Sequence, residues 1–504
     1  MSACRKDNTS PRSGAAGNGN GNGNNTSGQR TSDEDSLKFY VWWINESDSD
    51  NIPLYYWYDQ VPQLNPFSSS FKNADSLLSG SNGIASYPVV NGKKVDKYSF
   101  LDRVGSVSGE LEGGVSGDFG IEVGLAYDEQ NNAHIAVLYC YAGSPAAEEG
   151  VQRGWEITAL DGNSNMTLDG GTNSKRIVNA LYNDPTTTFT FTLPDNTSKT
   201  VTLTRASYHI NPVLLDTVYQ VGSEKVGYFV YNSFISVEGS DNAANAKSEI
   251  DNAFSNFKTK GVQDLIVDLR YNGGGAVVST EYLDDLIAPA AANGQVMYTS
   301  KYNAPLTAYF SSIPDYKKDY IDPVDFSIAS NNLNLSRVFF IVDEGTASAS
   351  ELTINNLKPY MDVKLVGNTT YGKPVGFIPI SIEFVTDTAG YAHVADMYAI
   401  NDETVNSQGK GQYYDGMTPD NQLTDYVGYN WGDTNDPRLR SIFNYIQGNG
   451  FLSQSDIDNG ESNHRQKKPA VEYLRVKNEP SLRNPHAFNG MVDYRRSFNF
   501  RIKK

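Results

Sequence analysis

Apolar and polar positions along this chain follow different patterns in successive regions. Residues 36–104 contain strongly aromatic, apolar segments such as Leu37–Ile44 and Leu54–Tyr58, which predict a small helical unit. Residues 105–206 contain short β-rich runs, among them Ile135–Tyr139, separated by Gly, Asn and Asp turns. This second pattern predicts a small, mostly β domain.

Strand and helix patterns then alternate from residue 207 to residue 460. Val226–Tyr231 and Val338–Val342 read as strands, and Ala243–Phe257 reads as an amphipathic helix. The alternation predicts a mixed α/β domain, so the whole chain is expected to be a multidomain α+β protein.

Both ends differ from these regions. Residues 1–35 are polar and rich in Gly and Asn, and we expect them to form a disordered linker. Residues 461–504 carry 11 Lys and Arg against 4 Asp and Glu, a basic tail on an acidic protein. Such a tail either docks back on the acidic body or extends as a separate segment.

Composition narrows the possible partners. The 504 residues exceed one compact core, and the net charge of -18 repels polyanions, so nucleic acid is not an expected partner. No apolar run reaches the roughly 18 to 20 residues of a membrane-spanning helix. We expect a soluble chain that associates with a membrane only through a lipid anchor.

The two cysteines have different predicted roles. Cys140 lies in an apolar run and reads as a buried structural thiol. The opening Met1-Ser2-Ala3-Cys4 resembles the end of a bacterial lipobox, with an initiator Met in place of the signal peptide, so Cys4 is a candidate lipidation site; an accidental cysteine is the alternative. The cysteines suggest neither a disulfide framework nor a Cys/His zinc cluster, and the family resemblance described below implies no metal or organic cofactor.

The histidines do not support a Ser-His-Asp triad, because none of the five lies beside a Gly-x-Ser-x-Gly turn. A buried lysine is the alternative base, since desolvation lowers its pKa. The predicted strand Val338–Val342 leads through a turn to Ser348 at a helix start, where N–H groups favour negative charge. A second strand, Asp362–Val366, leads to Lys373 between Gly372 and Pro374.

These two motifs resemble the carboxy-terminal processing, or tail-specific, serine peptidases. The stretch Thr346-Ala347-Ser348-Ala349-Ser350-Glu351, followed by Tyr371-Gly372-Lys373, carries the likeness. It implies a catalytic domain like those of ClpP and the crotonases, in which Ser348 rather than Ser350 is the nucleophile and Lys373 the general base.

Two further segments agree with this family. The run Val267–Gly275 is similar to its strand and glycine loop, which implies an oxyanion hole built from Gly274 or Gly273 together with Ala349. Gly416–Asp420 resembles its late Gly-x-x-Pro-Asp segment. One position departs from the family: Phe377 stands where a glutamine often orients the base.

The β-rich region resembles a PDZ domain. Ser144–Gly162 is similar to the PDZ helix, glycine turn and strand, and Phe119, Gly120 and Ile121 match the loop that binds a peptide carboxylate. In such a loop, backbone N–H groups converge on the carboxylate while the next strand pairs with the peptide. The resemblance implies protein or peptide substrates with free, apolar C-termini.

Together these features predict a lipid-anchored serine endopeptidase of the bacterial cell envelope, periplasm-facing or at the cell surface. Two alternatives remain open. The same fold could serve as a non-catalytic peptide-binding scaffold, which the departure at Phe377 favours. Trp42, Trp43 and Trp57 could also form an aromatic platform for glycan.

Overall fold

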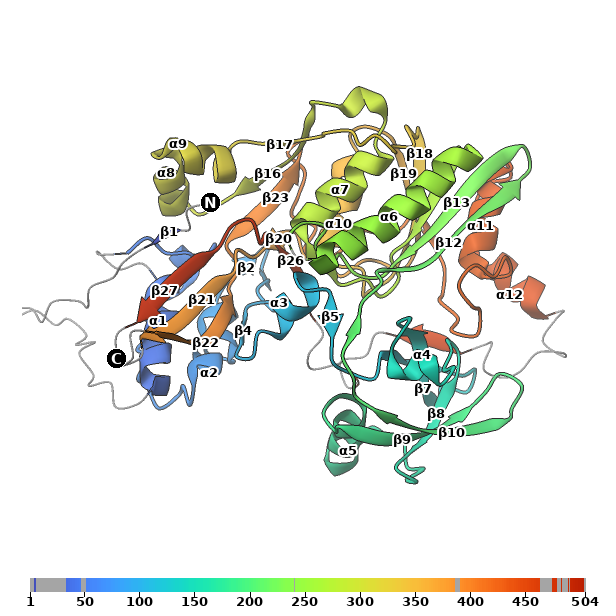
Figure 1. Cartoon of the computed structure of the whole chain (residues 1–504), viewed down its shortest axis with the longest axis horizontal. Coiled ribbons are helices and arrows are strands. Elements are labelled where there is room, and N and C mark those ends of the chain that lie inside the picture. Colours follow the sequence, from blue (N-terminus) through green and yellow to red (C-terminus); the bar gives the residue numbers. More distant parts are fainter. Residues whose placement is uncertain are drawn as a thin grey trace, which may run out of the picture.

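The computed structural model describes residues 4–5, 33–46, 51–239, 241–385, 390–462, 474–477, 482, 488 and 490–502. The disorder predicted for residues 1–35 therefore falls almost entirely outside the described residues, as does the side chain of Cys4. The multidomain α+β class predicted from the sequence is confirmed, with three lobes visible in Figure 1.

A six-stranded sheet forms the centre of the largest lobe. Its order is β12-β13-β14-β18-β19-β24, and only β12 runs antiparallel to its neighbour. The strands are β12 (Val213–Val221), β13 (Glu224–Tyr231), β14 (Asp264–Asp268), β18 (Arg337–Val342), β19 (Asp362–Gly367) and β24 (Asn421–Gln422).

Alternate residues of these strands enter two different cores, as the two-residue period of a strand requires. In β18, Phe340 packs under the helices on one face of the sheet, and its neighbour Phe339 packs under the helices on the other face. The first face carries α6 (Asp241–Lys260), α7 (Val277–Ile287) and α10 (Ala349–Leu357); the second carries α11 (Pro437–Ile446) and α12 (Gln454–Ser462).

The β-rich region forms a separate lobe, which we call the β6–β10 unit. Its sheet has the order β10-β9-β8-β7-β6-β25, in which the last strand comes from the C-terminal tail. The elements are β6 (Ile121–Tyr127), β7 (Ala133–Cys140), α4 (Pro145–Glu148), β8 (Glu156–Leu160), α5 (Thr172–Tyr182), β9 (Thr186–Thr192), β10 (Ser198–Thr204) and β25 (Arg475–Lys477).

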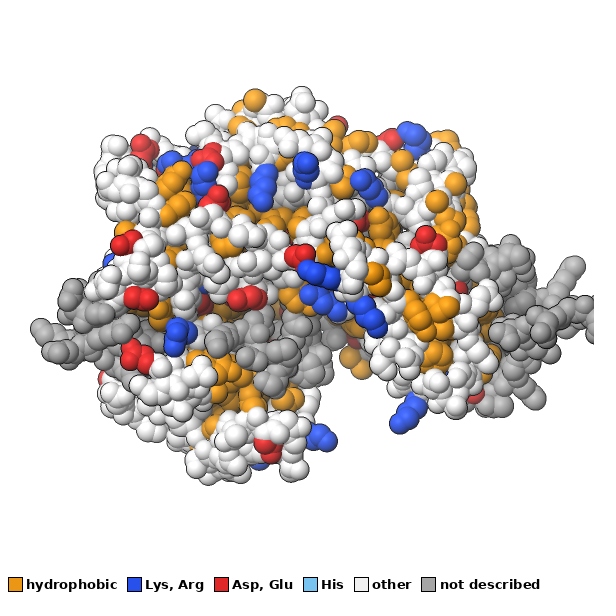
Figure 2. Space-filling view, turned by 180° about the vertical axis from the view of Figure 1, so that it is seen from behind, with side chains coloured by type: hydrophobic (Ala, Val, Ile, Leu, Met, Phe, Trp, Pro, Cys, Tyr) orange, Lys and Arg blue, Asp and Glu red, His pale blue; other side chains and the backbone are white. Residues whose placement is uncertain are grey.

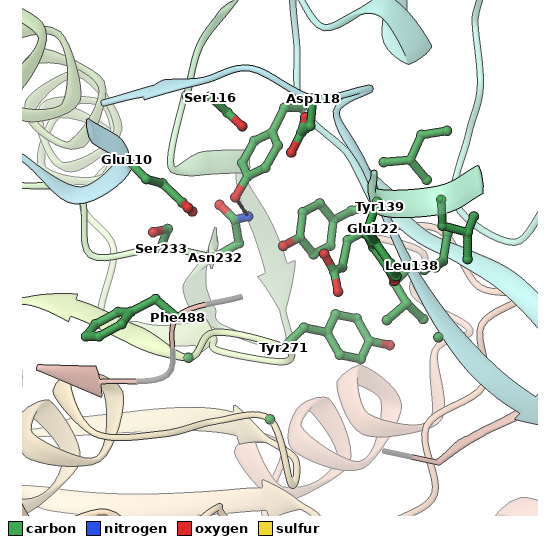
Figure 3. Close-up of a pocket in the computed structure, with 18 of the residues that line it drawn as sticks. Glu110, Ser116, Asp118, Glu122, Leu138, Tyr139, Asn232, Ser233, Tyr271 and Phe488 are labelled. Carbon is green, nitrogen blue, oxygen red and sulfur yellow. Dashed lines mark hydrogen bonds between the residues drawn. The ribbon is translucent and has the colours of Figure 1, made fainter. Parts of the chain in front are cut away.

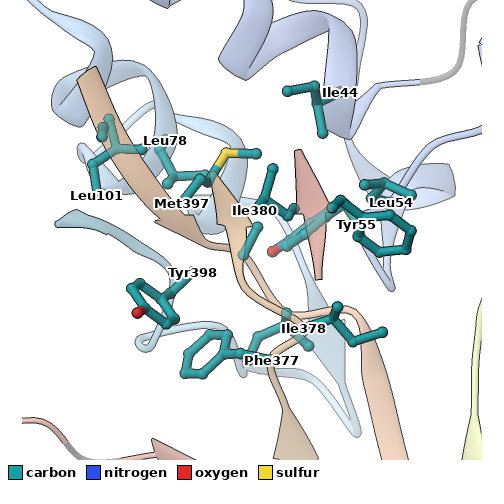
Figure 4. Close-up of a cluster of buried hydrophobic side chains, with 14 of the residues drawn as sticks. Ile44, Leu54, Tyr55, Leu78, Leu101, Phe377, Ile378, Ile380, Met397 and Tyr398 are labelled. Atoms are coloured by element: carbon teal, nitrogen blue, oxygen red, sulfur yellow. The ribbon is translucent and has the colours of Figure 1, made fainter. Parts of the chain in front are cut away.

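The N-terminal region does not have a core of its own. Its helices α1 (Asp33–Asn45) and α2 (Ala74–Ser79) cover a sheet of order β1-β27-β21-β22-β4, whose strands come largely from distant parts of the chain. Figure 4 shows Ile44 and Leu78 from the helices packed with Ile380 and Met397 from the sheet. The strands are β1 (Cys4–Arg5), β4 (Phe100–Asp102), β21 (Ile380–Val385), β22 (Tyr391–Tyr398) and β27 (Phe498–Ile502).

Two predictions for this region are wrong. The aromatic run 54–58 is mostly irregular, with a short 3-10 turn over Tyr58–Gln60, because its rings serve as core residues rather than as one face of a helix. The alternative of a glycan platform is also contradicted, since Trp42 and Trp57 are only 6% and 5% exposed within this core and Trp43 packs against it.

Short elements complete the lobes. A four-stranded sheet of order β17-β16-β23-β20 flanks the central lobe, and β15 pairs in parallel with β26 of the tail. Their bounds are β2 (Val89–Val90), β3 (Lys93–Lys94), α3 (Ser106–Leu111), β5 (Val115–Ser116), β11 (Tyr208–His209), β15 (Gly274–Ala276), β16 (Val296–Lys301), α8 (Ala304–Ser311), α9 (Pro314–Tyr316), β17 (Val324–Asp325), β20 (Val375–Gly376), β23 (Asp402–Asn406) and β26 (Gly490–Val492).

Seen from behind, the β6–β10 unit and the N-terminal lobe project from the body with a recess between them (Figure 2).

A buried ion-pair cluster connects the β6–β10 unit to the body. Arg153, in the turn before β8, donates to the carbonyl oxygen of Tyr429 at 2.9 Å and lies 3.4 Å from Asp425, which also pairs with Arg270 at 2.8 Å. Within the described residues, no helix has the length and apolar composition needed to cross a membrane.

Candidate active site

Ser348 occupies the predicted position between strand and helix. β18 ends at Val342, the turn follows, and Ser348 is the N-cap residue of α10, with φ 57° and ψ -106°. This conformation is strained for a residue with a Cβ, and such strain is typical of functional turns. The side chain is fully buried, and its Oγ has no hydrogen-bond partner among the described residues.

Lys373 follows β19 and points its amino group into an aromatic cage. Its Nζ lies 3.9 Å from the ring centroid of Phe377, 4.9 Å from that of Tyr98 and 5.7 Å from that of Phe488. Burial holds the pKa of Lys373 well below its ordinary value, although the carboxylates of Asp96, Glu351 and Asp402 oppose this shift. The residue that replaces the family glutamine is therefore part of the wall that desolvates the lysine.

Glu351 joins the two candidate residues. One oxygen of its buried carboxylate accepts the backbone N–H of Ser348 at 2.9 Å and that of Lys373 at 2.8 Å. The other accepts the N–H of Gly372 at 2.8 Å and the hydroxyl of Thr370. Glu351 is not among the site residues predicted from the sequence, although a glutamate three residues after a helix-capping serine is a signal that could identify it.

The glycine loop lies beside the serine, but one of its predicted donors is already used. The N–H of Gly274 donates to Asn272 Oδ1 at 2.9 Å, because that side chain turns back over the loop. Gly274 is thus unsuited to the oxyanion role in this conformation. A Cβ built on Gly274 would come within 3.0 Å of the nitrogen of Ala349, so the loop approaches the first turn of α10 closely.

Gly273 and Gly274 line one end of a cavity of about 440 Å³, which extends to the β6–β10 unit. Figure 3 shows Tyr271 and Phe488 at the catalytic side, with Leu138, Tyr139 and Glu122 opposite them. Its walls carry six carboxylates against one cation, Arg205; the carboxylates are Glu110, Asp118, Glu122, Asp343, Glu344 and Asp425. Burial, reinforced by Asp118, raises the pKa of Glu110 to about 7.

The predicted carboxylate-binding loop is only partly open to this cavity. Phe119 and Ile121 line it and Gly120 does not, and most of the Phe119 ring is buried in the core of the β6–β10 unit under the guanidinium of Arg205. The N–H of Gly120 donates to Asp118 Oδ1 at 2.6 Å. That N–H is therefore not directed at a ligand here, because the aspartate before the loop satisfies it.

The remaining candidates lie away from this centre. Burial raises the pKa of the Cys140 thiol to about 12, as expected for a structural cysteine. His134 contacts Glu156 and Asp128 at the edge of the β6–β10 unit, and His393 contacts Asp396. No cluster of three or more potential metal ligands occurs in the part of the chain that the structure describes.

The central lobe matches a known family. Residues 225–422, which run from β13 to β24 and contain both Ser348 and Lys373, match the sequence model "Peptidase family S41". This part of the chain is therefore similar to peptidase family S41.

Curated relatives are carboxy-terminal processing proteases. That of Picosynechococcus is 27% identical over 306 residues, 58% of this chain and 61% of the relative. The C-terminal processing peptidase of Tetradesmus obliquus chloroplasts is 26% identical over 55% of this chain and 56% of its own length. The chain thus spans about three-fifths of the length of these relatives.

Among solved structures, a Bacteroides fragilis protein assigned to the S41 proteases has a TM-score of 0.58 at 23% identity. The likeness covers 82% of this chain and 97% of that one. At this identity the likeness establishes a shared fold, and it extends well beyond the matched residues 225–422.

Proposed function

We propose that the protein is a serine endopeptidase in which Ser348 is the nucleophile and Lys373 the general base. One observation carries the proposal: a fully buried lysine with a lowered pKa is tied through Glu351 to the backbone of a strained serine at a helix N-terminus. A neutral amine at that position can accept a proton, which is what a serine nucleophile requires.

In the proposed reaction, Ser348 Oγ attacks the scissile carbonyl carbon while Lys373 Nζ takes the hydroxyl proton. The N–H groups of Ala349 and Gly273 stabilise the oxyanion, since Gly274 N–H is used by Asn272. The lysine then gives its proton to the leaving amine. Water attacks the resulting acyl-enzyme, with Lys373 again as base, and the serine is regenerated.

We further propose that the substrates are proteins or peptides that enter through the cavity between the β6–β10 unit and the glycine loop. The PDZ-like features of residues 105–206 support recognition of an apolar C-terminus there. The lipobox-like start supports attachment to a bacterial cell envelope through Cys4. Metabolic labelling with a fatty acid, lost in Cys4→Ser, is the test of that attachment.

The competing proposal is a scaffold that binds peptides without cleaving them. Its support is that Ser348 Oγ is closed off from solvent and makes no hydrogen bond to any described residue. In that case loss of the serine would change no product.

Digestion of casein, and of peptides with free apolar C-termini, distinguishes the serine endopeptidase from the peptide-binding scaffold. We expect cleavage by the parent protein and none by Ser348→Ala or Lys373→Ala at equal concentration and equal thermal stability. Peptide binding without cleavage by the parent protein would instead establish the scaffold.

A further inference from the structure

The open edge of the β6–β10 sheet is covered by a segment of the chain's own tail. β25 pairs antiparallel with β6, with Arg475 opposite Tyr127, Val476 opposite Ala126 and Lys477 opposite Leu125. Residues 475–477 therefore run along β6 in the direction of Ile121 and the Phe119–Gly120 loop. This is strand addition to a sheet edge, the mode by which extended peptides are recognised.

Leu482, the next described residue of the tail, fills an apolar pocket beside that loop. It is 3% exposed in the core that contains Phe119, Leu181 and Phe189. The hydroxyl of Tyr182, at the end of α5, donates to the carbonyl oxygen of Leu482 at 3.2 Å. An apolar side chain thus occupies the place beside the loop that a bound peptide's anchor residue would need.

The body of the protein holds the other side of the same segment. The N–H of Val476 donates to the carbonyl oxygen of Asp425 at 3.0 Å, and the N–H of Val427 donates to that of Leu474 at 3.1 Å. Leu474 is buried with Val427 and Ala126. The tail is consequently clamped between the β6–β10 unit and the domain that carries the candidate active site.

Further along, the tail reaches the candidate catalytic centre. Gly490 begins β26, which pairs with β15 at Gly274, and Phe488 contributes one ring of the cage around Lys373. A Cβ built on Gly490 would lie 2.9 Å from Lys373 Nζ. One continuous tail therefore contacts both the sheet edge and the residues that would cut a peptide.

Charge favours the same occupant. The cavity next to β6 has six carboxylates and one arginine in its walls, whereas residues 461–504 carry 11 basic and 4 acidic residues. An acidic cavity retains basic segments and repels acidic ones.

We infer that the edge of β6 is a peptide-binding groove whose resident ligand is the chain's own tail, through Leu474–Lys477 and Leu482. A substrate segment with basic residues around an apolar anchor binds by displacing it. This inference rests on the proposed function where it calls the displacing peptide a substrate. Binding of the peptide to the groove can be tested without cleavage.

Because the tail is tethered, it competes at an effective concentration of about 1 mM, so an external peptide should bind about tenfold or more weakly than to a vacant groove. The test uses the full chain with Ser348→Ala, which removes cleavage from the readout. A fluorescent peptide with the sequence of residues 471–486 is titrated by anisotropy. Leu482→Asp in the protein should tighten binding at least about tenfold, since the tail loses its anchor.

Two matched controls accompany this titration. Val104→Asp, at a side chain that is 83% exposed, should leave the affinity unchanged. A peptide with aspartate in place of Leu482 should bind neither protein. Equal affinity of the labelled peptide for the parent and a folded Leu482→Asp protein would overturn the inference.

A second variant decides the matter if Leu482→Asp does not fold. Ala126→Cys with Val476→Cys places two thiols on directly opposed residues of β6 and β25. When oxidised, this protein should not bind the peptide, and reduction should restore binding. Equal binding by both forms would refute displacement, whereas absence of casein cleavage by the parent protein would bear only on the proposed activity.

Discussion

Replacing Glu351 by Gln should loosen the candidate active site at a cost that its hydrogen bonds define. The two carboxylate oxygens accept four donors, which are three backbone N–H groups and one hydroxyl. A carboxamide keeps one acceptor oxygen and places an NH₂ group against two of these donors. The Thr370 hydroxyl can rotate to accept from that NH₂, so at least one buried backbone N–H is left unpaired.

An unpaired buried donor costs about 1–3 kcal/mol, and the surviving bonds lose the roughly 1 kcal/mol that a charged acceptor adds. The expected loss for Glu351→Gln is therefore about 2–4 kcal/mol of unfolding free energy. Urea unfolding followed by tryptophan fluorescence at pH 8 measures it, since burial raises the pKa of Glu351 and the carboxylate must be ionised. If Glu351 positions both residues, kcat should fall while KM changes little.

Glu344→Gln is the matched control, because that carboxylate lies in the turn that precedes α10 but is exposed. Its substitution should change stability by less than about 0.5 kcal/mol. If Glu351→Gln unfolds at the same urea concentration as Glu344→Gln, the positioning role assigned to Glu351 is wrong.

Three other substitutions test neighbouring features. Lys373→Met should be more stable than the parent, most clearly at low pH. The lysine of the unfolded chain binds a proton below about pH 10.4, whereas the buried lysine resists protonation, so the stability of the parent rises with pH. Urea midpoints of the two proteins that run parallel from pH 6 to 10 would contradict this. Gly274→Ala should lower the melting temperature more than Gly92→Ala. Both glycines have positive φ, but only the Cβ at position 274 would meet backbone, the carbonyl oxygen of Gly490 at 2.4 Å. Equal losses would show that φ alone matters. Asp425→Asn should lower the free energy of unfolding in urea by about 3 kcal/mol or more, because it removes the charged partner of two buried arginines. Asp415→Asn, in an exposed ion pair, should lower it by less than about 1 kcal/mol. Similar losses would refute the anchoring role of the cluster.

Local patterns in the sequence were sufficient to predict the placement of Ser348. A buried apolar strand, a turn and a helix start are each encoded by adjacent residues, and β18, the N-cap position and α10 are all confirmed. Parallel pairing of β18 with β19 then places the segment after Val366 on the same side of the sheet as the serine. This position agrees with the selection of Lys373, which rested on the resemblance of Tyr371-Gly372-Lys373 to the family motif.

The contributions of the tail could not be predicted in this way. β25 and β26 have three residues each, too few to show a two-residue period, and they pair with strands more than 200 residues earlier in the chain. The sequence left open whether the basic tail docks on the body, and the described parts of it do. The shared core of the N-terminal lobe escaped prediction for the same reason, since β21, β22 and β27 enter it from far along the chain.

The most direct test of the central claim is covalent labelling with a fluorophosphonate, which phosphonylates activated serines, followed by peptide mass mapping. The proposal predicts time-dependent labelling of the peptide that contains Ser348, with the adduct on Ser348 itself. Labelling should be absent in Ser348→Ala and strongly slowed in Lys373→Ala. An adduct on Ser350 or elsewhere, or equal labelling of the parent and Lys373→Ala, would contradict the Ser348/Lys373 dyad.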